Sequence, residues 1–197
     1  MDRYMVLLRN KNSEPKDSRL LVKRANELCS DINVTIRDAR ISKKFIQYDV
    51  SVEKNDLAKF VDMVKPISEL VLARHIKDEK IEKDQYIKDG IFYFNEERFW
   101  EAHEAWEGAW KMSTGQEKLL LQGIILIAVA FAHYQKFSNS VCIGMMGRAL
   151  GKIGQISGIY HNIDVDLMKN RAQDIRTSKN IATFKTVSYT HLTLPTK

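Results

Sequence analysis

The stretch of sequence that decides the fold reads Phe99-Trp-Glu-Ala-His-Glu-Ala-Trp-Glu-Gly-Ala-Trp110. At about 100° of rotation per residue, its phenylalanine, alanines and two of its tryptophans share one side of a helix. His103 and Glu107 are one turn apart and lie in the sector bordered by Trp100. Glu101 lies outside this sector and is expected to be solvated. Polar groups beside an apolar face need partners, because burying an unpaired polar group costs free energy. The segment therefore predicts a packed helix that carries a polar pair.

A nearly continuous apolar stretch from Glu117 to Lys136 predicts the central helix of a helical bundle. Its polar interruptions are Gln122 and His133. The short loop from Ser113 to Gln116 would make the two helices antiparallel neighbours. Counting outward from that loop places Gln122 level with Glu107. We therefore predict a structural polar cluster in which Gln122 locks the pair, surrounded by Trp100, Trp106 and Trp110.

The polar pair also suggests a metal site. A histidine and a glutamate one turn apart can bring a nitrogen and a carboxylate to one ion, but catalytic zinc takes three protein ligands. The third candidate is His133, which counting along the helices places about ten ångströms from His103. From the residues alone, a hydrogen-bonded structural pair is the simpler interpretation, and metal or acid–base chemistry is the alternative.

Two motifs carry a resemblance to a known family. The first is the segment 99–110, and the second is Leu119-Leu-Leu-Gln-Gly-Ile-Ile-Leu-Ile-Ala-Val-Ala-Phe-Ala-His-Tyr134. They occur in order at family-like spacing, and Arg148-Ala-Leu150 also fits the pattern. Over about Gly90 to Leu150 the chain resembles the bacterial and archaeal family called domain of unknown function three-hundred-nine.

The resemblance implies an α-helical fold and a metal-dependent hydrolase, which is how that family has been labelled. Carried over by motif position, its polar residues are His103, Glu104, Glu107, Gln122 and His133. For a hydrolase, Glu104 or Glu107 would act as general base on water. The metal ligands for a divalent ion such as zinc would be His103, Glu107 and His133.

A second function class follows from the packing pattern of the same helices. Small and large residues alternate at the spacing of a tetratricopeptide helix hairpin, at Gly90, Tyr93, Phe99, Ala102, Trp106 and Ala109. Small residues let two helices approach, and aromatic rings fill the gaps. This pattern favours a non-catalytic scaffold or a peptide-binding module.

The first part of the chain alternates between strand and helix patterns. Strands are expected near 4–8, 34–36, 46–52 and 70–73, the third of them half-buried. Helices are expected to be capped by Ser18 and Asp56. The order β-α-β-β-α-β is that of a ferredoxin-like domain.

This part carries a basic turn that could be mistaken for an RNA-binding surface, with cations at Arg37, Arg40, Lys43 and Lys44. An RNA-recognition sheet stacks bases on aromatic residues of one face. Phe45 and Tyr48 have opposite parity and would face opposite sides of a strand. The sequence therefore argues against nucleic acid and favours a solvated hairpin tip.

The whole chain is predicted to be an α+β protein with two domains. A ferredoxin-like domain over 1–78 is followed by a linker at 79–83 and an all-α helical bundle over 84–180. Within and beside the bundle, helices are expected at 83–95, 97–112, 117–136, 140–158 and 164–177.

The last residues read Val187-Ser-Tyr-Thr-His-Leu-Thr-Leu-Pro-Thr-Lys197. The first six are what one reading frame of a common sequencing-library transposon end encodes. We interpret 187–197 as a non-native sequencing-adapter tail on a metagenomic fragment, whose natural sequence would diverge near Thr186.

Composition bounds the class of protein. The 197 residues are 44% hydrophobic and 28% charged, which suits a globular chain and excludes a disordered or collagenous one. The longest apolar run, 119–132, is shorter than the roughly 18 residues of a membrane span. The absence of a leader pattern and the two cysteines predict a reducing cytoplasm and no membrane. The net charge of +6 is mild.

Glycines recur at Gly144, Gly147, Gly151, Gly154 and Gly158. Each costs about 1 kcal/mol relative to alanine inside a helix, so the stripe needs a compensating role. We expect close backbone packing there, either within the bundle or in a homodimer formed through the helix 144–158.

Overall fold

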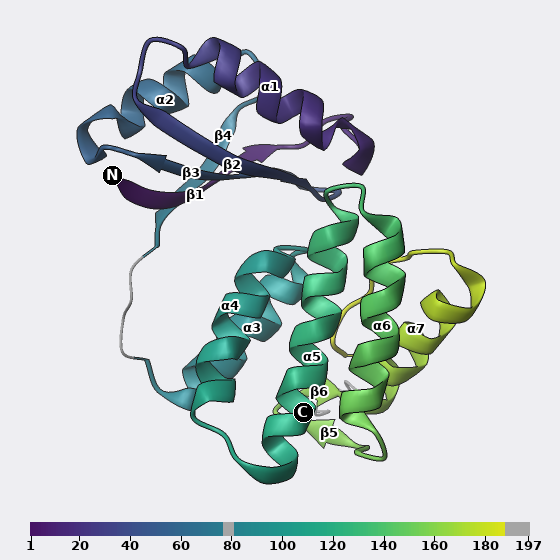
Figure 1. Cartoon of the computed structure of the whole chain (residues 1–197). Helices are drawn as coiled ribbons and strands as arrows, with labels where there is room; N and C mark the ends of the chain where they lie inside the picture. Colours follow the sequence, from purple (N-terminus) through teal and green to yellow (C-terminus); the bar gives the residue numbers. More distant parts are fainter. Residues whose placement is uncertain (77–80, 188–197) are drawn as a thin grey trace, which may run out of the picture. The chain divides into compact units, whose positions relative to one another are not determined.

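The computed structural model describes residues 1–76 and 81–187 (Figure 1). Its contacts divide the chain into two units, one of residues 1–80 with 133–138 and one of residues 81–132 with 139–197. The first is built on a sheet and the second on helices, which confirms the α+β class. Part of the predicted linker and all but Val187 of the predicted tail lie outside the described residues, and the domain boundaries stay a prediction.

The first unit is a four-stranded antiparallel sheet with strand order β2-β3-β1-β4. Its elements follow the order β-α-β-β-α-β, which confirms the predicted ferredoxin-like architecture. Their bounds are β1 Asp2–Arg9, α1 Ser18–Leu28, β2 Val34–Ile41, β3 Phe45–Val52, α2 Leu57–Val64 and β4 Leu70–His75.

Two helices cover one face of this sheet and close a core. Tyr48 from β3 and Phe60 from α2 are fully buried in it. The Tyr48 hydroxyl donates a hydrogen bond to the Leu21 carbonyl oxygen at 3.1 Å, and burial raises the pKa of this tyrosine. Ser18 was predicted to cap α1, but its hydroxyl donates to the Ala39 carbonyl oxygen at 2.6 Å instead. It therefore ties the start of α1 to β2.

The other face of β3 is also buried, so the half-buried strand of the prediction is wrong. Asp49 is only 2% exposed and accepts two hydrogen bonds from Arg3, at 2.9 and 2.7 Å. Burial raises the pKa of Asp49, but Arg3 together with Arg40 and Arg37 outweighs burial and leaves that pKa below its usual value. Arg40 is 2% exposed and bonded to Asp38, so it is not part of a solvated hairpin tip.

The second unit consists mainly of five helices. Each lies within a few residues of its predicted range except at the end of the fourth. Their bounds are α3 Lys83–Asn95, α4 Phe99–Lys111, α5 Gly115–Tyr134, α6 Asn139–Ile153 and α7 Val165–Ser178.

Helix α6 ends at Ile153, five residues before its predicted end at 158. Gly154 and Gly158 have positive φ values of 56° and 87°, which stop a right-handed helix. A small hairpin follows, β5 Ile159–Tyr160 paired with β6 Ile163–Asp164. Helical periodicity missed this hairpin because its strands are only two residues long.

Helices α3 and α4 pack closely where glycine faces an aromatic ring. A methyl group added at Gly90 would collide with the indole of Trp106, and one added at Gly108 would lie 2.5 Å from Tyr86 Cε1. The Trp106 indole N–H donates to the Ile87 carbonyl oxygen at 3.2 Å. These contacts are the small-against-large packing that the tetratricopeptide-like spacing predicts.

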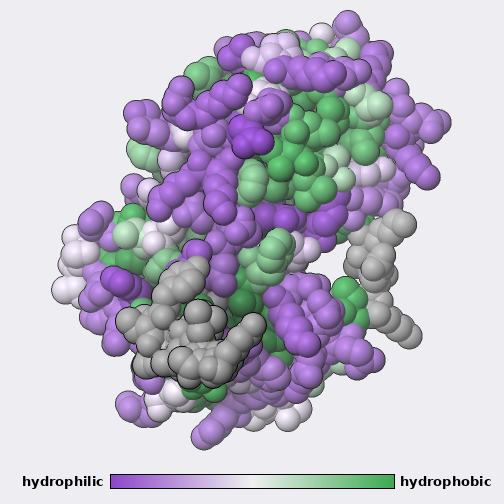
Figure 2. All heavy atoms as spheres, turned by 180° about the vertical axis from the view of Figure 1, so that it is seen from behind, coloured by the Kyte–Doolittle hydropathy of each residue, from purple (hydrophilic) through white to green (hydrophobic). Residues whose placement is uncertain are grey.

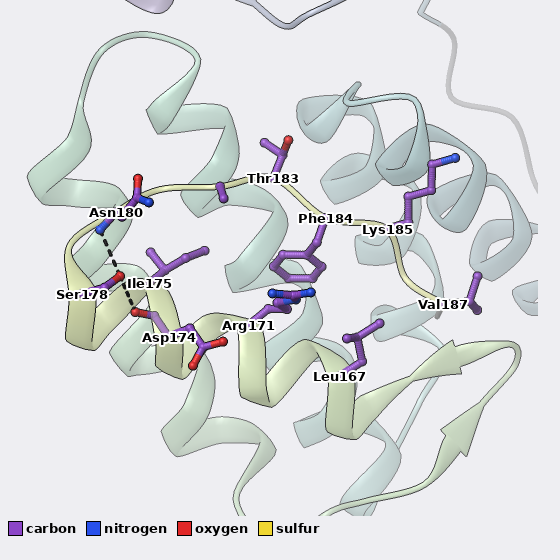
Figure 3. Close-up of a pocket in the computed structure, with 11 residues that line it drawn as sticks. Leu167, Arg171, Asp174, Ile175, Ser178, Asn180, Thr183, Phe184, Lys185 and Val187 are labelled. Atoms are coloured by element: carbon purple, nitrogen blue, oxygen red, sulfur yellow. Dashed lines mark hydrogen bonds between the residues drawn. The ribbon is translucent and has the colours of Figure 1, made fainter. Parts of the chain in front are cut away.

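An aromatic cluster forms the centre of this unit. Phe94 of α3 packs against Phe99 at 5.0 Å and Phe131 of α5 at 6.0 Å between ring centroids. Phe184 joins from residues 180–187, which we call the return segment because it follows α7 back across the bundle (Figure 3). The described chain therefore closes its second core with residues that come after its last helix.

The glycine stripe of α6 is not explained by close packing within the chain. Among residues 1–76 and 81–187, nothing lies within 4 Å of a methyl group added at Gly144 or Gly151, and one added at Gly147 would meet only the side chain of Arg176. The expectation of close packing within the bundle is therefore wrong at these positions. A homodimer through 144–158 stays a prediction.

Helix α5 passes a length and composition test for crossing a membrane, but 56% of its apolar window is buried. Core helices of soluble proteins pass the same test, so α5 is weak evidence for a membrane. Hydrophilic side chains cover much of the face shown in Figure 2, with hydrophobic areas between them. Cys29 and Cys142 are free and buried, and the cytoplasmic location stays a prediction.

Candidate functional site on helix α4

Helix α4 positions the candidate site. Its core-facing residues include Phe99, Ala102, Trp106 and Ala109, all fully buried. That side fixes the rotation of the helix, because Trp106 packs against α3 and Phe99 packs between Phe94 of α3 and Phe131 of α5. The opposite side then carries the polar residues at one-turn spacing.

The polar pair is brought together as expected. His103 Nε2 lies 3.2 Å from Glu107 Oε1, and the two side chains are 14% and 45% exposed. Among the described residues, His103 Nδ1 is buried without a hydrogen-bond partner. Any ligand that reaches this imidazole must therefore do so at Nε2, next to the carboxylate of Glu107.

The indole of Trp100 and the carboxylate of Glu104 lie on the same side of the helix as this pair. The ring of Trp100 lies 4.8 Å from that of His103, tilted by 52°. Its indole N–H donates to Glu104 Oε1 at 2.9 Å. We call Trp100, His103, Glu104 and Glu107 the α4 band, in which two aromatic rings are followed along the helix by two carboxylates.

The remaining residues of the predicted cluster are dispersed. Trp106 is fully buried against α3. Trp110 lies under the ammonium of Lys118, 4.3 Å from the ring centroid. Gln122 is half-buried, and in the described part of the chain no hydrogen bond joins it to His103 or Glu107. No contact therefore supports the predicted role of Gln122 in holding the His103–Glu107 pair in place.

The donor set was also tested against a metal ion. In residues 1–76 and 81–187, no group of three His, Cys, Asp or Glu side chains could hold one. His133 is grouped with the first unit, whereas His103 and Glu107 belong to the second. The α4 band supplies one His–Glu pair, whereas catalytic zinc takes three protein ligands. These residues therefore do not by themselves fit a catalytic metal centre.

Sequence reasoning missed a buried ion pair at the start of α4. The helical projection places Glu101 in solvent, yet Glu101 is 1% exposed. Both its oxygens accept hydrogen bonds from Arg98, each at 2.6 Å, and the Arg98 guanidinium lies 4.5 Å from the centre of the Tyr93 ring. A projection of α4 alone contains no information about the turn that folds Arg98 back onto it.

A second network lies at the other end of the hairpin. Glu117 accepts hydrogen bonds from Lys83 at 3.1 Å and from the Tyr160 hydroxyl at 2.9 Å. Burial raises the pKa of Glu117, but the hydrogen bonds from Lys83, Tyr160 and Ser113 outweigh burial and lower it. Sequence reasoning had no signal for Tyr160, because it comes from the unexpected β5–β6 hairpin.

A family model matches the middle of the chain. Residues 87–143 match the family model described as Domain of unknown function (DUF309). This part of the chain is similar to the DUF309 family. The match confirms the resemblance drawn from the two motifs. No curated protein matches the chain.

The matched region, residues 87–143, runs from α3 into α6 and contains the whole α4 band. It also contains the Gly90–Trp106 contact and the Arg98–Glu101 pair. Residues 1–80 of the first unit lie outside the match, whereas its residues 133–138 lie within it.

Proposed function

We propose that the matched region is a protein-binding module and that its α4 band binds a basic segment of a partner protein. The observation that supports this proposal is the Trp100–His103 ring contact, flanked by the carboxylates of Glu104 and Glu107. Indole faces and carboxylates attract the same ligands, namely the guanidinium and ammonium groups of Arg and Lys.

Each part of the band has a role in such binding. The indole of Trp100 offers a cation–π surface, which is worth about 0.5–1 kcal/mol at an exposed site. The carboxylate of Glu107 is 45% exposed and is within reach of a partner's cation. The imidazole of His103 supports the indole from one side, so the ring of Trp100 is already oriented before a ligand arrives.

The packing of α3 on α4 supports a scaffold role. The collision of any added methyl group at Gly90 with Trp106 means that the two helices are held at one separation. A rigid hairpin presents a fixed surface, which lowers the entropy lost on binding. This is the role that the tetratricopeptide-like spacing favours.

A metal-dependent hydrolase is the second candidate, supported by the 3.2 Å contact of His103 Nε2 with Glu107 and by the family label. In that case Glu107 or Glu104 would be the general base. Because the described donors make only a pair, we place no catalytic step on a metal ion.

The test is binding of a fluorescein-labelled peptide of alternating lysine and alanine, followed by fluorescence anisotropy at low salt. We expect the full chain to bind it, and Glu107→Gln or Trp100→Leu to weaken binding about fivefold. Glu27→Gln, which removes the same charge from α1 in the other unit, is the matched control and should bind normally. Equal affinities for all variants, or no binding by the parent protein, would refute the proposal.

The same preparations distinguish the hydrolase. Hydrolysis of p-nitrophenyl acetate with added zinc, abolished by Glu107→Gln and retained in Glu27→Gln, would favour the enzyme. Absence of hydrolysis together with peptide binding would favour the binding module.

A further inference from the structure

A groove lies between helix α7 and the return segment, within the second unit and away from the α4 band (Figure 3). Its volume is about 540 Å³, which falls within the range of small-molecule sites. Leu167, Ile175 and Phe184 give it apolar walls. Val187, the first residue of the predicted non-native tail, also lines it, so the inference below rests on the other residues.

The wall formed by the return segment is fixed in place. The Thr186 amide donates to Asn95 Oδ1 at 2.9 Å, and the Thr183 hydroxyl donates to Glu97 Oε1 at 2.7 Å. Between them, the ring of Phe184 packs at 5.7 Å from Phe94 and at 5.3 Å from Phe131. The groove is therefore a stable feature of the packed unit.

Two opposite charges line the helix side of the groove. Arg171 and Asp174 are three residues apart on α7, and neither side chain forms a hydrogen bond or ion pair with any residue in the described parts of the chain. Figure 3 shows the side chain of Arg171 extending from α7 toward the return segment, whereas the side chain of Lys185 points away from α7. The α7 side of the groove thus holds one cation and one anion, both exposed, beside an apolar wall.

We infer that this groove binds an α-amino acid with a large apolar side chain. The guanidinium of Arg171 would take the carboxylate through two parallel hydrogen bonds, the strongest geometry for this pair. The carboxylate of Asp174 would take the ammonium group. The apolar side chain would pack against Phe184 and Leu167, where an aromatic ring gains from edge or offset contact with Phe184.

Charge complementarity favours an amino acid over ligands that carry only one of its two charges. A carboxylic acid without an ammonium group would leave Asp174 unpaired near a second anion. An amine without a carboxylate would face the cation of Arg171. Only the zwitterion satisfies both charges at once.

Calorimetric titration of the full chain with L-phenylalanine tests the inference, with 3-phenylpropionate and phenethylamine as the two single-charge probes. We expect L-phenylalanine to bind at least about tenfold more tightly than either probe. Arg171→Met should weaken binding of both L-phenylalanine and 3-phenylpropionate by about tenfold, since both use the guanidinium. Asp174→Asn should weaken only L-phenylalanine.

The control is Arg148→Met, which removes an exposed arginine from α6 and should leave all three affinities unchanged. Phenethylamine or 3-phenylpropionate binding as tightly as L-phenylalanine would overturn the inference, as would an Asp174→Asn variant with normal affinity for L-phenylalanine. Failure of all three probes to bind would overturn it too. None of these outcomes depends on the α4 band.

Discussion

The α3–α4 hairpin and helix α6 both contain glycines within helices, but the glycines have opposite surroundings. In the hairpin, Gly90 and Gly108 each face an aromatic ring that leaves no room for a methyl group. In α6, Gly144 and Gly151 face open space. The difference shows that glycine spacing indicates close packing only where a large residue at the matching position of another helix fills the gap.

The largest effect is expected at the tip of the hairpin. Glu101→Gln leaves the buried guanidinium of Arg98 without its counter-charge, and breaking one side of a buried ion pair costs about 3–5 kcal/mol. We expect the free energy of unfolding to fall by about 4 kcal/mol in urea denaturation. Glu27→Gln, whose parent side chain is 64% exposed, is the control and should change little. A decrease of less than about 1 kcal/mol would mean that the Arg98–Glu101 ion pair does not stabilise the tip of the hairpin.

The contact at the middle of the hairpin comes next. Gly90→Ala forces a methyl group into the indole of Trp106, and overpacking of this kind costs about 1–3 kcal/mol. We expect a loss near the upper end of that range, because both partners are buried. Measuring the midpoint of urea unfolding and near-ultraviolet circular dichroism of the tryptophans checks this. An unchanged midpoint would contradict the interlocked packing.

Helix α6 should respond in the opposite direction. Gly151→Ala removes backbone entropy from the unfolded chain and adds no collision, so we expect stabilisation by about 0.5–1 kcal/mol. The same substitution therefore has opposite signs at Gly90 and Gly151. If the homodimer through 144–158 forms, Gly151→Ala should instead reduce the dimer fraction in sedimentation. That result would mean that the glycines of α6 are also closely packed, against a second copy of the chain.

The smallest effect is expected at Glu117, which accepts hydrogen bonds from Lys83 and Tyr160. Because the pKa of Glu117 is lowered in the folded protein, its stabilisation is present above the usual glutamate range of about 4.3 and is lost as pH falls through the lowered value. Glu117→Gln should cost about 1 kcal/mol at neutral pH, given its partial exposure. The gap between variant and parent should close on acidification below pH 4. A constant gap would mean that the carboxylate charge is not involved.

Much of the fold could be predicted from periodicity. The strand at 46–52 and the helices at 83–95 and 164–177 are defined by apolar residues at regular spacing, and those patterns depend only on the segment itself. The end of α6 could not be predicted this way, since glycines continue at helical spacing past Ile153 to Gly158, and the two-residue strands of the β5–β6 hairpin give no periodic signal. Ser18 was misjudged for a related reason: its acceptor, Ala39, lies 21 residues away.

The candidate site was predictable only as far as one helix determines it. His103 and Glu107 meet because four residues make about one turn. Glu101 was placed in solvent because a projection of α4 cannot include Arg98, which comes from the preceding turn. The groove beside α7 had no sequence signal, since one of its walls is an extended segment without periodicity.

The return segment sets the order in which the second unit can be completed during synthesis. Thr186 bonds to Asn95 across 91 residues, and Thr183 bonds to Glu97 across 86. At about 5–20 residues per second, the α3–α4 hairpin leaves the ribosome on the order of ten seconds before Phe184 arrives to cover Phe94. During that interval the aromatic cluster is open on one side, so nascent chains stalled before residue 183 should bind holdase chaperones through this surface.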